Sequence, residues 1–189
     1  MWLKTVFDYV FALFLLPFLL PVIFILVVIS TLDTAQLGWF GHDRIGKNGR
    51  HFSIYKIRTM KGHSDNPIST AKTHQITRIG RFLRQTKLDE LPQIFNILFG
   101  QMSFVGPRPD VAGYADLLSG EDRLILSVKP GITGPAQLAF KNEDELLSEQ
   151  LDPVQYNDEV IWPQKVAINR AYVQNWSFLK DIGYILKTI

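Results

Sequence analysis

The 189-residue chain contains no cysteine, which excludes disulfide bonds and cysteine-ligated metal centres. Neither sign of charge is in large excess, because 20 lysines and arginines stand against 18 aspartates and glutamates. The net charge of +2 therefore does not indicate a nucleic-acid partner. Histidine is scarce, and none of the spacings is typical of a zinc site, so we interpret the histidines as scattered surface residues. They are His42, His51, His63 and His74.

One long segment near the N-terminus is strongly apolar. No charged or strongly polar side chain occurs from residue 10 to residue 29, and about 20 helical residues are long enough to cross a bilayer core. Pro17 and Pro21 lie inside this run and predict a kink or break. Two topologies stay open: a spanning helix, and a re-entrant helix that returns to the same face. Basic residues after the run predict that the body of the protein is cytoplasmic.

The remainder of the chain shows no internal repeat and no low-complexity linker. This predicts one domain, residues 34–189, after a membrane segment of residues 1–33. Apolar and polar side chains alternate over residues 51–60, which predicts a strand or one arm of a hairpin. Other segments rich in glycine, proline or polar residues predict a turn-rich connection at 38–49, a loop at 61–73 and a turn at 129–134.

Two segments in the middle of the chain have helical patterns. Residues 76–84 predict an amphipathic helix with arginines three residues apart, and this basic face is either solvated or turned toward phosphate or lipid headgroups. Residues 91–99 are mostly apolar and predict a buried helix that begins close to Glu90, with a proline in its first turn. The predicted fold is therefore α+β: a mostly helical cytoplasmic domain with a small β-hairpin or sheet, plus the N-terminal membrane helix.

The stretch from Arg84 to Pro109 carries the most chemistry. It contains the adjacent carboxylates Asp89 and Glu90, and a Pro-Arg-Pro turn that presents Arg108. This combination suits phosphoryl chemistry, because a carboxylate can act as nucleophile or metal ligand while guanidinium groups hold phosphate oxygens. Acidic residues are also common as caps in the first turn of a helix, so capping is the structural alternative.

These motifs resemble those of a known family. The stretch LDELPQIFNILFGQMSFVGPRPD, with KIRTM before it and KPGITGPAQ after it, is similar to the bacterial sugar transferases. These are monotopic polyprenyl-phosphate phosphoglycosyl transferases, and the minimal single-domain type is nearest, as in the bacillosaminyl-phosphate transferase of bacterial N-glycosylation. The resemblance covers nearly the whole chain. It implies transfer of a phospho-sugar from a UDP-sugar, N-acetylated or amino-substituted, to undecaprenyl phosphate, with release of UMP and with Mg²⁺.

The resemblance also implies roles for particular residues. Asp89 matches the nucleophile, which forms an aspartyl-phosphosugar in a ping-pong mechanism, and Glu90 matches its partner; both are expected close to the metal ion. The expected phosphate- and nucleotide-binding residues are Lys56, Arg58, Arg84, Arg108 and Lys141, the last in place of a family arginine. The family's hydrophobic segment is re-entrant and breaks at a Ser-Pro pair that aligns with Leu20-Pro21, so Pro17 and Pro21 mark the expected break. The resemblance places the protein at the bacterial inner membrane.

Two other classes of function compete with this interpretation. In a non-catalytic, membrane-anchored adaptor, the arginines would bind lipid headgroups and the acidic pair would only cap a helix. In a lipid-phosphate hydrolase, water would replace the acceptor, although no histidine general acid is placed near the acidic pair. The transferase interpretation implies a UDP-sugar, undecaprenyl phosphate and membrane lipids as partners, and no nucleic acid. Downstream glycosyltransferases or a second copy of the chain are protein partners that it would allow.

Overall fold

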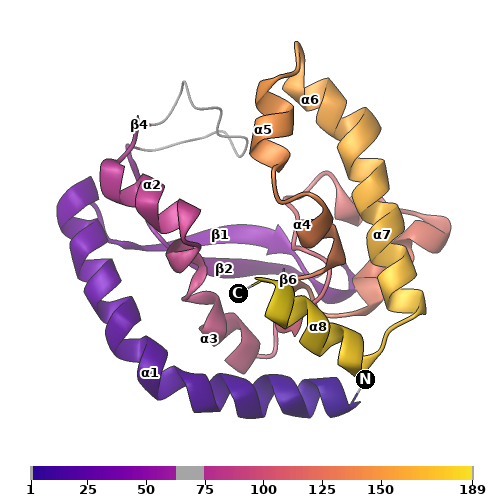
Figure 1. The fold of residues 1–189 in the computed structure, drawn as a ribbon, viewed down its shortest axis with the longest axis horizontal. Coiled ribbons are helices and arrows are strands. Elements are labelled where there is room, and N and C mark those ends of the chain that lie inside the picture. The colour runs from indigo at the N-terminus through magenta and orange to yellow at the C-terminus, as the bar shows by residue number, and fades with distance from the viewer. Residues whose placement is uncertain (1, 63–74, 189) are drawn as a thin grey trace. The chain divides into compact units, whose positions relative to one another are not determined.

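The computed structural model describes residues 2–62 and 75–188 (Figure 1). The chain folds as two compact units, the first comprising residues 1–44 and 51–101 and the second residues 45–50 and 102–189. Helices predominate in the described part, where the strands form three two-stranded sheets. The predicted mostly helical α+β class with a small sheet is confirmed. The loop predicted at 61–73 falls almost wholly outside the described residues.

Helix α1 (Trp2–Thr34) begins the first unit and extends beyond the apolar run at both ends. Among the described helices it alone is long and apolar enough to cross a membrane, and only 11% of its most apolar 18-residue window is buried. Pro17 and Pro21 lie inside it; the chain stays helical through both, and Figure 1 shows the helix bending about midway along its length. Each proline removes a backbone donor, which accounts for a bend there. The exposed apolar surface of α1 indicates association with a membrane.

Strands β1 (Trp39–Ile45) and β2 (His51–Ile57) pair to form a hairpin. The prediction for β2 is confirmed, whereas the prediction of a turn-rich connection over residues 38–49 is wrong over β1. The glycines that suggested a connection have other uses: a Cβ atom at Gly38 would collide with the carbonyl oxygen of Val27, so this glycine lets the chain pass close to α1.

Helices α2 (Arg78–Gln85) and α3 (Gln93–Leu98) confirm the two helical predictions. The expected start of α3 near Glu90 is wrong, because a 3₁₀ turn, η2 (Leu88–Glu90), comes first and the helix begins at Gln93. Pro92 has no N–H group and so interrupts the α-helical hydrogen-bond ladder just after the acidic pair. Two short strands complete this unit: β3 (Met60–Lys61) and β4 (Gln75–Ile76), paired antiparallel.

In the second unit, strands β5 (Ser103–Val105) and β6 (Gly131–Thr133) pair in parallel, with Ser103 opposite Gly131. The turn predicted at residues 129–134 is therefore wrong over β6. Three 3₁₀ helices belong to this unit: η1 (Lys47–Gly49), η3 (Ala115–Leu117) and η4 (Gly120–Ser127). The other elements are α4 (Pro135–Ala139), α5 (Glu143–Ser148), α6 (Pro153–Tyr156), the π-helix η5 (Asn157–Ile161), α7 (Trp162–Gln174) and α8 (Phe178–Thr188). The core of this unit is formed by Ile45, Ala115, Ile125, Leu126 and Val166.

Candidate active site

The acidic pair is buried in the first unit. Asp89 is 7% exposed and Glu90 is 9% exposed, whereas carboxylates that only cap a helix are usually solvated. They lie in the turn η2, which follows Lys87, a residue held in the left-handed conformation with φ of 58°. This conformation ends α2 in the manner that glycine usually provides, and it redirects the chain so that both carboxylates point into the protein.

Lys56 of β2 contacts this pair. Its Nζ atom lies 2.7 Å from Oε1 of Glu90, in an ion pair that is mostly shielded from solvent. The hairpin is fixed at this position by Asn96 of α3, whose side chain is fully buried. The Asn96 amide accepts from the N–H of Tyr55 (3.0 Å) and donates to the carbonyl oxygen of Ser53 (2.8 Å). These two bonds position the strand immediately before Lys56.

Asp89 is electrostatically unusual. Burial raises the pKa of its carboxyl group above the usual value, and the neighbouring Glu90 charge raises it further. Lys56 is the largest influence that lowers this pKa, followed by Arg84 and Lys87. Oδ1 of Asp89 is buried and has no hydrogen-bond partner among the described residues. A buried carboxylate oxygen without a partner is costly for stability, and such groups occur where a substrate or ion completes the site.

The two arginines predicted for this region use part of their hydrogen-bonding capacity within the protein. The Nε atom of Arg84 donates to Oγ1 of Thr59 (2.9 Å), and its charge acts on Asp89. The guanidinium of Arg58 donates to the carbonyl oxygen of Leu37 (2.9 Å) and lies 5.0 Å from the ring centre of Phe40. The structure therefore brings Lys56 and Arg84 to the acidic pair, and it directs Arg58 toward the start of β1.

The end of the apolar helix α1 is attached to the same hairpin. The hydroxyl group of Ser30 donates to the carbonyl oxygen of Arg58, and the hydroxyl group of Thr31 accepts from the N–H of Gly38 (2.8 Å). Helix α1 also contacts α2 and α3, the helices on either side of η2. The membrane-associated helix thus supports the elements that carry the acidic pair.

Arg108 and Lys141 belong to the second unit. Arg108 is exposed and follows β5 in the Pro-Arg-Pro turn, which the N–H of Gly131 holds by donating to the carbonyl oxygen of Pro107 (2.8 Å). The β5–β6 pair thus joins the two family-like motifs of this unit. The ammonium group of Lys141 donates to the carbonyl oxygen of Lys187 at the end of α8 (3.1 Å). That contact is typical of a helix C-terminus, and nucleotide binding by Lys141 stays a prediction.

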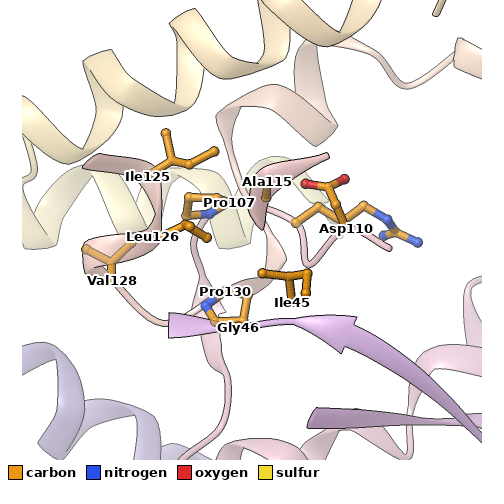
Figure 2. A pocket seen from close by; sticks show the side chains of 10 residues that line it. Ile45, Gly46, Pro107, Asp110, Ala115, Ile125, Leu126, Val128 and Pro130 are labelled. Atoms are coloured by element: carbon orange, nitrogen blue, oxygen red, sulfur yellow. The ribbon is translucent and has the colours of Figure 1, made fainter. Parts of the chain in front are cut away.

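Figure 2 shows a small hollow beside the Pro-Arg-Pro turn in the second unit. Arg108 and Asp110 are the charged residues in its lining. The rest of the lining is apolar or backbone: Ile45, Gly46, Pro107, Ala115, Ile125, Leu126, Val128 and Pro130. This composition suits packing of the core more than recognition of a charged phospho-sugar.

The sequence interpretation missed His42 and Arg44. His42 was taken as a surface residue, but it is half-buried in β1, and its Nδ1 atom lies 3.2 Å from Nη2 of Arg44. Burial lowers the pKa of His42, and the charges of Arg44 and Lys56 lower it further. The spacing of His42 and Arg44 could have predicted this contact, since residues two apart on a strand share one face. It was obscured when the segment was interpreted as a turn.

Asp89 and Glu90 suit Mg²⁺ that is bound jointly by protein carboxylates and the phosphates of a substrate. No group of three or more histidine, aspartate or glutamate side chains that could hold a metal occurs among the described residues. Mg²⁺, however, is commonly bound by one or two carboxylates together with the phosphates of a substrate. The buried Oδ1 atom of Asp89, beside the Glu90 carboxylate, offers ligands of that kind.

Comparison with known proteins agrees with these motifs. The model of the bacterial sugar transferase family matches residues 1–189, so the chain belongs to this family. It is 34% identical to the UDP-galactose-lipid carrier transferase of Erwinia amylovora, over 99% of this chain and 39% of that protein. It is 33% identical to the exopolysaccharide production protein ExoY of Sinorhizobium fredii, over 98% of this chain and 83% of that protein.

A third relative is named for a specific reaction. The chain is 32% identical to the UDP-glucose:undecaprenyl-phosphate glucose-1-phosphate transferase of Caulobacter vibrioides, over 98% of this chain and 68% of that protein. The chain thus spans well under half of the Erwinia protein and most of the other two. None of these three relatives is named as a bacillosaminyl-phosphate transferase, and that resemblance stays a prediction.

Proposed function

We propose that this protein is a phosphoglycosyl transferase, which moves a sugar 1-phosphate from a UDP-sugar to undecaprenyl phosphate and releases UMP. The observation that carries the proposal is the buried Asp89 carboxylate, whose Oδ1 atom has no hydrogen-bond partner among the described residues. Family membership and the names of the relatives supply the class of reaction.

The proposed chemistry has two steps. An oxygen atom of Asp89 attacks the sugar-bearing phosphorus of the UDP-sugar, and the bond from that phosphorus to the bridging oxygen breaks, so that UMP leaves with the electron pair. The product is an acyl phosphate on Asp89. A phosphate oxygen of undecaprenyl phosphate then attacks the same phosphorus, the Asp89 carboxylate leaves, and undecaprenyl-diphospho-sugar forms. Covalent catalysis of this kind gives ping-pong kinetics.

The neighbouring residues have defined tasks in this scheme. Lys56 keeps Glu90 in place through the 2.7 Å ion pair and favours the ionised form of Asp89. Arg84 adds positive charge, and its Nε atom is fixed by Thr59. We propose that Arg58, Arg108 and Lys141 contact the phosphates or the nucleotide. Asp89 and Glu90 would hold Mg²⁺, which, when bound, neutralises charge on the diphosphate.

The proposal also includes the membrane topology of α1. We propose that α1 is re-entrant, turning at Pro17 and Pro21, and that the catalytic domain of residues 34–189 lies on the cytoplasmic face of the inner membrane. The bend of α1 in Figure 1 supports the turn, and the bond from Ser30 to Arg58, just after β2, attaches the helix to the residues that carry the acidic pair. It would hold Asp89 at the depth of the lipid headgroups, where the acceptor phosphate lies. Downstream glycosyltransferases or a second copy of the chain could dock on the cytoplasmic domain.

The donor sugar is the least specified part of the proposal. The motif resemblance predicts an N-acetylated or amino sugar, whereas two of the relatives are named for galactose and glucose. Purified protein in nanodiscs would therefore be incubated with Mg²⁺ and UDP-galactose, UDP-glucose or UDP-N-acetylglucosamine, with and without undecaprenyl phosphate, while UMP is measured.

The expected result is multiple-turnover UMP release that requires both substrates and is abolished in Asp89→Asn. Glu149→Gln is the matched control, because Glu149 is an exposed carboxylate of the second unit. A well-folded protein that binds anionic vesicles but releases no UMP from any donor would favour the adaptor interpretation. Release of orthophosphate from a lipid diphosphate would favour the hydrolase.

A further inference from the structure

Strand β1 carries His42 and Arg44, and the hydrogen bond between them defines the tautomer of the histidine. Residues at alternate positions of a strand share one face, so His42 and Arg44 lie on the same face of β1. An Nη2–H group of Arg44 donates to Nδ1 of His42 at 3.2 Å. A guanidinium group can only donate, so Nδ1 must accept, and the imidazole proton is on Nε2.

The surroundings keep the imidazole neutral. Burial lowers the pKa of His42 most strongly, Arg44 and Lys56 lower it further, and Asp43 alone opposes them. Both cations disfavour a third positive charge at this place. His42 therefore presents an Nε2–H donor, and it does so without requiring protonation at neutral pH.

Lys56 connects this pair to the acidic residues. The same lysine that acts on His42 is 2.7 Å from Glu90 and is the largest influence lowering the pKa of Asp89. His42, Arg44 and Lys56 consequently form one cluster of N–H donors, which we name the β1 donor cluster. It carries two formal positive charges, and Glu90 forms an ion pair with its lysine.

We propose that the β1 donor cluster binds a phosphate group of a substrate next to Asp89, with Arg44 as the principal contact and His42 as a second donor. The planar fork of arginine matches the geometry of phosphate oxygens, and Arg44 is held in orientation by its bond to His42. The inference rests on the proposed transferase function. The phosphate belongs either to the diphosphate of the UDP-sugar or to the lipid acceptor, and both present the same chemistry.

Kinetics separate the two sources. In a ping-pong reaction, kcat/KM for the donor reports the first half-reaction, and kcat/KM for the lipid reports the second. We expect Arg44→Lys, which keeps the charge and loses the fork, to lower one of these values by about 10- to 100-fold and to leave the other within threefold. Arg50→Lys is the matched control, because Arg50 is an exposed arginine just before β2.

His42 is tested by a conservative rescue. The side-chain amide nitrogen of glutamine reaches approximately the position of Nε2, whereas that of asparagine does not. We therefore expect His42→Gln to retain more of the affected kcat/KM than His42→Asn. A purely structural role would lower the melting temperature and reduce both kcat/KM values together, and that pattern would overturn the proposal.

Binding measurements decide the matter even without turnover. UDP and farnesyl phosphate are titrated into wild type, Arg44→Lys and Arg50→Lys, and weakening of one ligand only in Arg44→Lys supports the site and names its source. Unchanged affinity for both ligands overturns it. If wild type binds UDP but releases no UMP from any donor, the proposed function fails, while the binding results still judge the donor cluster.

Discussion

Replacement of Lys56 by methionine removes one partner of the Lys56–Glu90 ion pair and preserves most of the side-chain volume. Loss of one partner from a fully buried pair costs about 3–5 kcal/mol. Here Lys56 is 19% exposed and Glu90 is 10% exposed, so we expect a smaller cost than for a fully buried pair, about 2–3 kcal/mol. For a chain of this length, this corresponds to a fall in Tm of about 5–10 °C.

The destabilisation caused by Lys56→Met has an upper bound, and it changes with pH in a defined direction. An unpaired glutamate can avoid the cost of a buried charge by taking up a proton. Protonation of a carboxyl group costs about 1.4 kcal/mol for each pH unit above its usual pKa, so the penalty at Glu90 cannot exceed about 4 kcal/mol at pH 7. Lys56 lowers the pKa of Asp89, so without Lys56 the Asp89 carboxyl group binds its proton still more readily in the folded state than in the unfolded state. The destabilisation is therefore present at neutral pH and shrinks as the pH falls toward 5.

The same substitution affects Asp89. Lys56 is the largest influence that lowers the pKa of Asp89, so Lys56→Met raises this pKa further above its usual range. The nucleophile must be ionised, and the acidic limb of the pH–rate profile should move to higher pH. Glu90 acts in the opposite sense, and the double variant Lys56→Met/Glu90→Gln should return the limb toward that of wild type.

Thermal unfolding in detergent at pH 7 and at pH 5, together with UMP release across the pH range, measures both effects. The double variant is the control for stability as well, because it leaves no unpaired charge at position 90 and should recover part of the lost Tm. If Lys56→Met changes Tm by less than 1 °C at pH 7, or if its loss of stability grows on acidification, the ion-pair reasoning is refuted.

Three further substitutions follow from the packing. Asn96→Leu removes the buried amide that bonds to Ser53 and Tyr55 of β2, and we expect a loss of about 3 kcal/mol in unfolding free energy, whereas exposed Asn175→Leu should cost less than 1 kcal/mol. Gly80→Ala places a methyl group against the carbonyl oxygen of Thr59, so it should lower Tm by several degrees and reduce activity by displacing α2. Asp181→Ala removes the buried carboxylate that joins α7 to α8 and should cost about 3 kcal/mol by thermal unfolding, a value that a change below 1 kcal/mol would contradict.

Local patterns predicted much of the first unit. The apolar run predicted the centre of α1, but hydropathy marks only the part suited to a membrane, so it could not give the ends of a helix that continues through polar residues to Thr34. The helical periodicity of α2 and the alternation of β2 were sufficient to predict these two elements, because each pattern depends on near neighbours in sequence. The start of α3 was misplaced because a proline can follow a 3₁₀ turn as readily as it can occupy the first turn of a helix.

Features that depend on distant partners could not be predicted. Strand β6 has three residues and exists through its pairing with β5, about 28 positions earlier in the chain. Strand β1 was missed because its flanking glycines serve close packing and turns, and with it the interpretation missed the pairing of His42 with Arg44. The acidic pair and Lys56 were recognised by motif, but their burial and ion pair depend on Asn96 and α3.

The most direct test of the account is a single-turnover measurement without the lipid acceptor. Stoichiometric protein is mixed with the UDP-sugar identified by the donor panel, UMP is quantified, and the peptide that contains Asp89 is examined by mass spectrometry. The account predicts up to one equivalent of UMP per protein and the added mass of a phospho-sugar on that peptide, both absent in Asp89→Asn. UMP that appears only after undecaprenyl phosphate is added, from a protein that turns over normally with both substrates, would contradict the covalent role of Asp89.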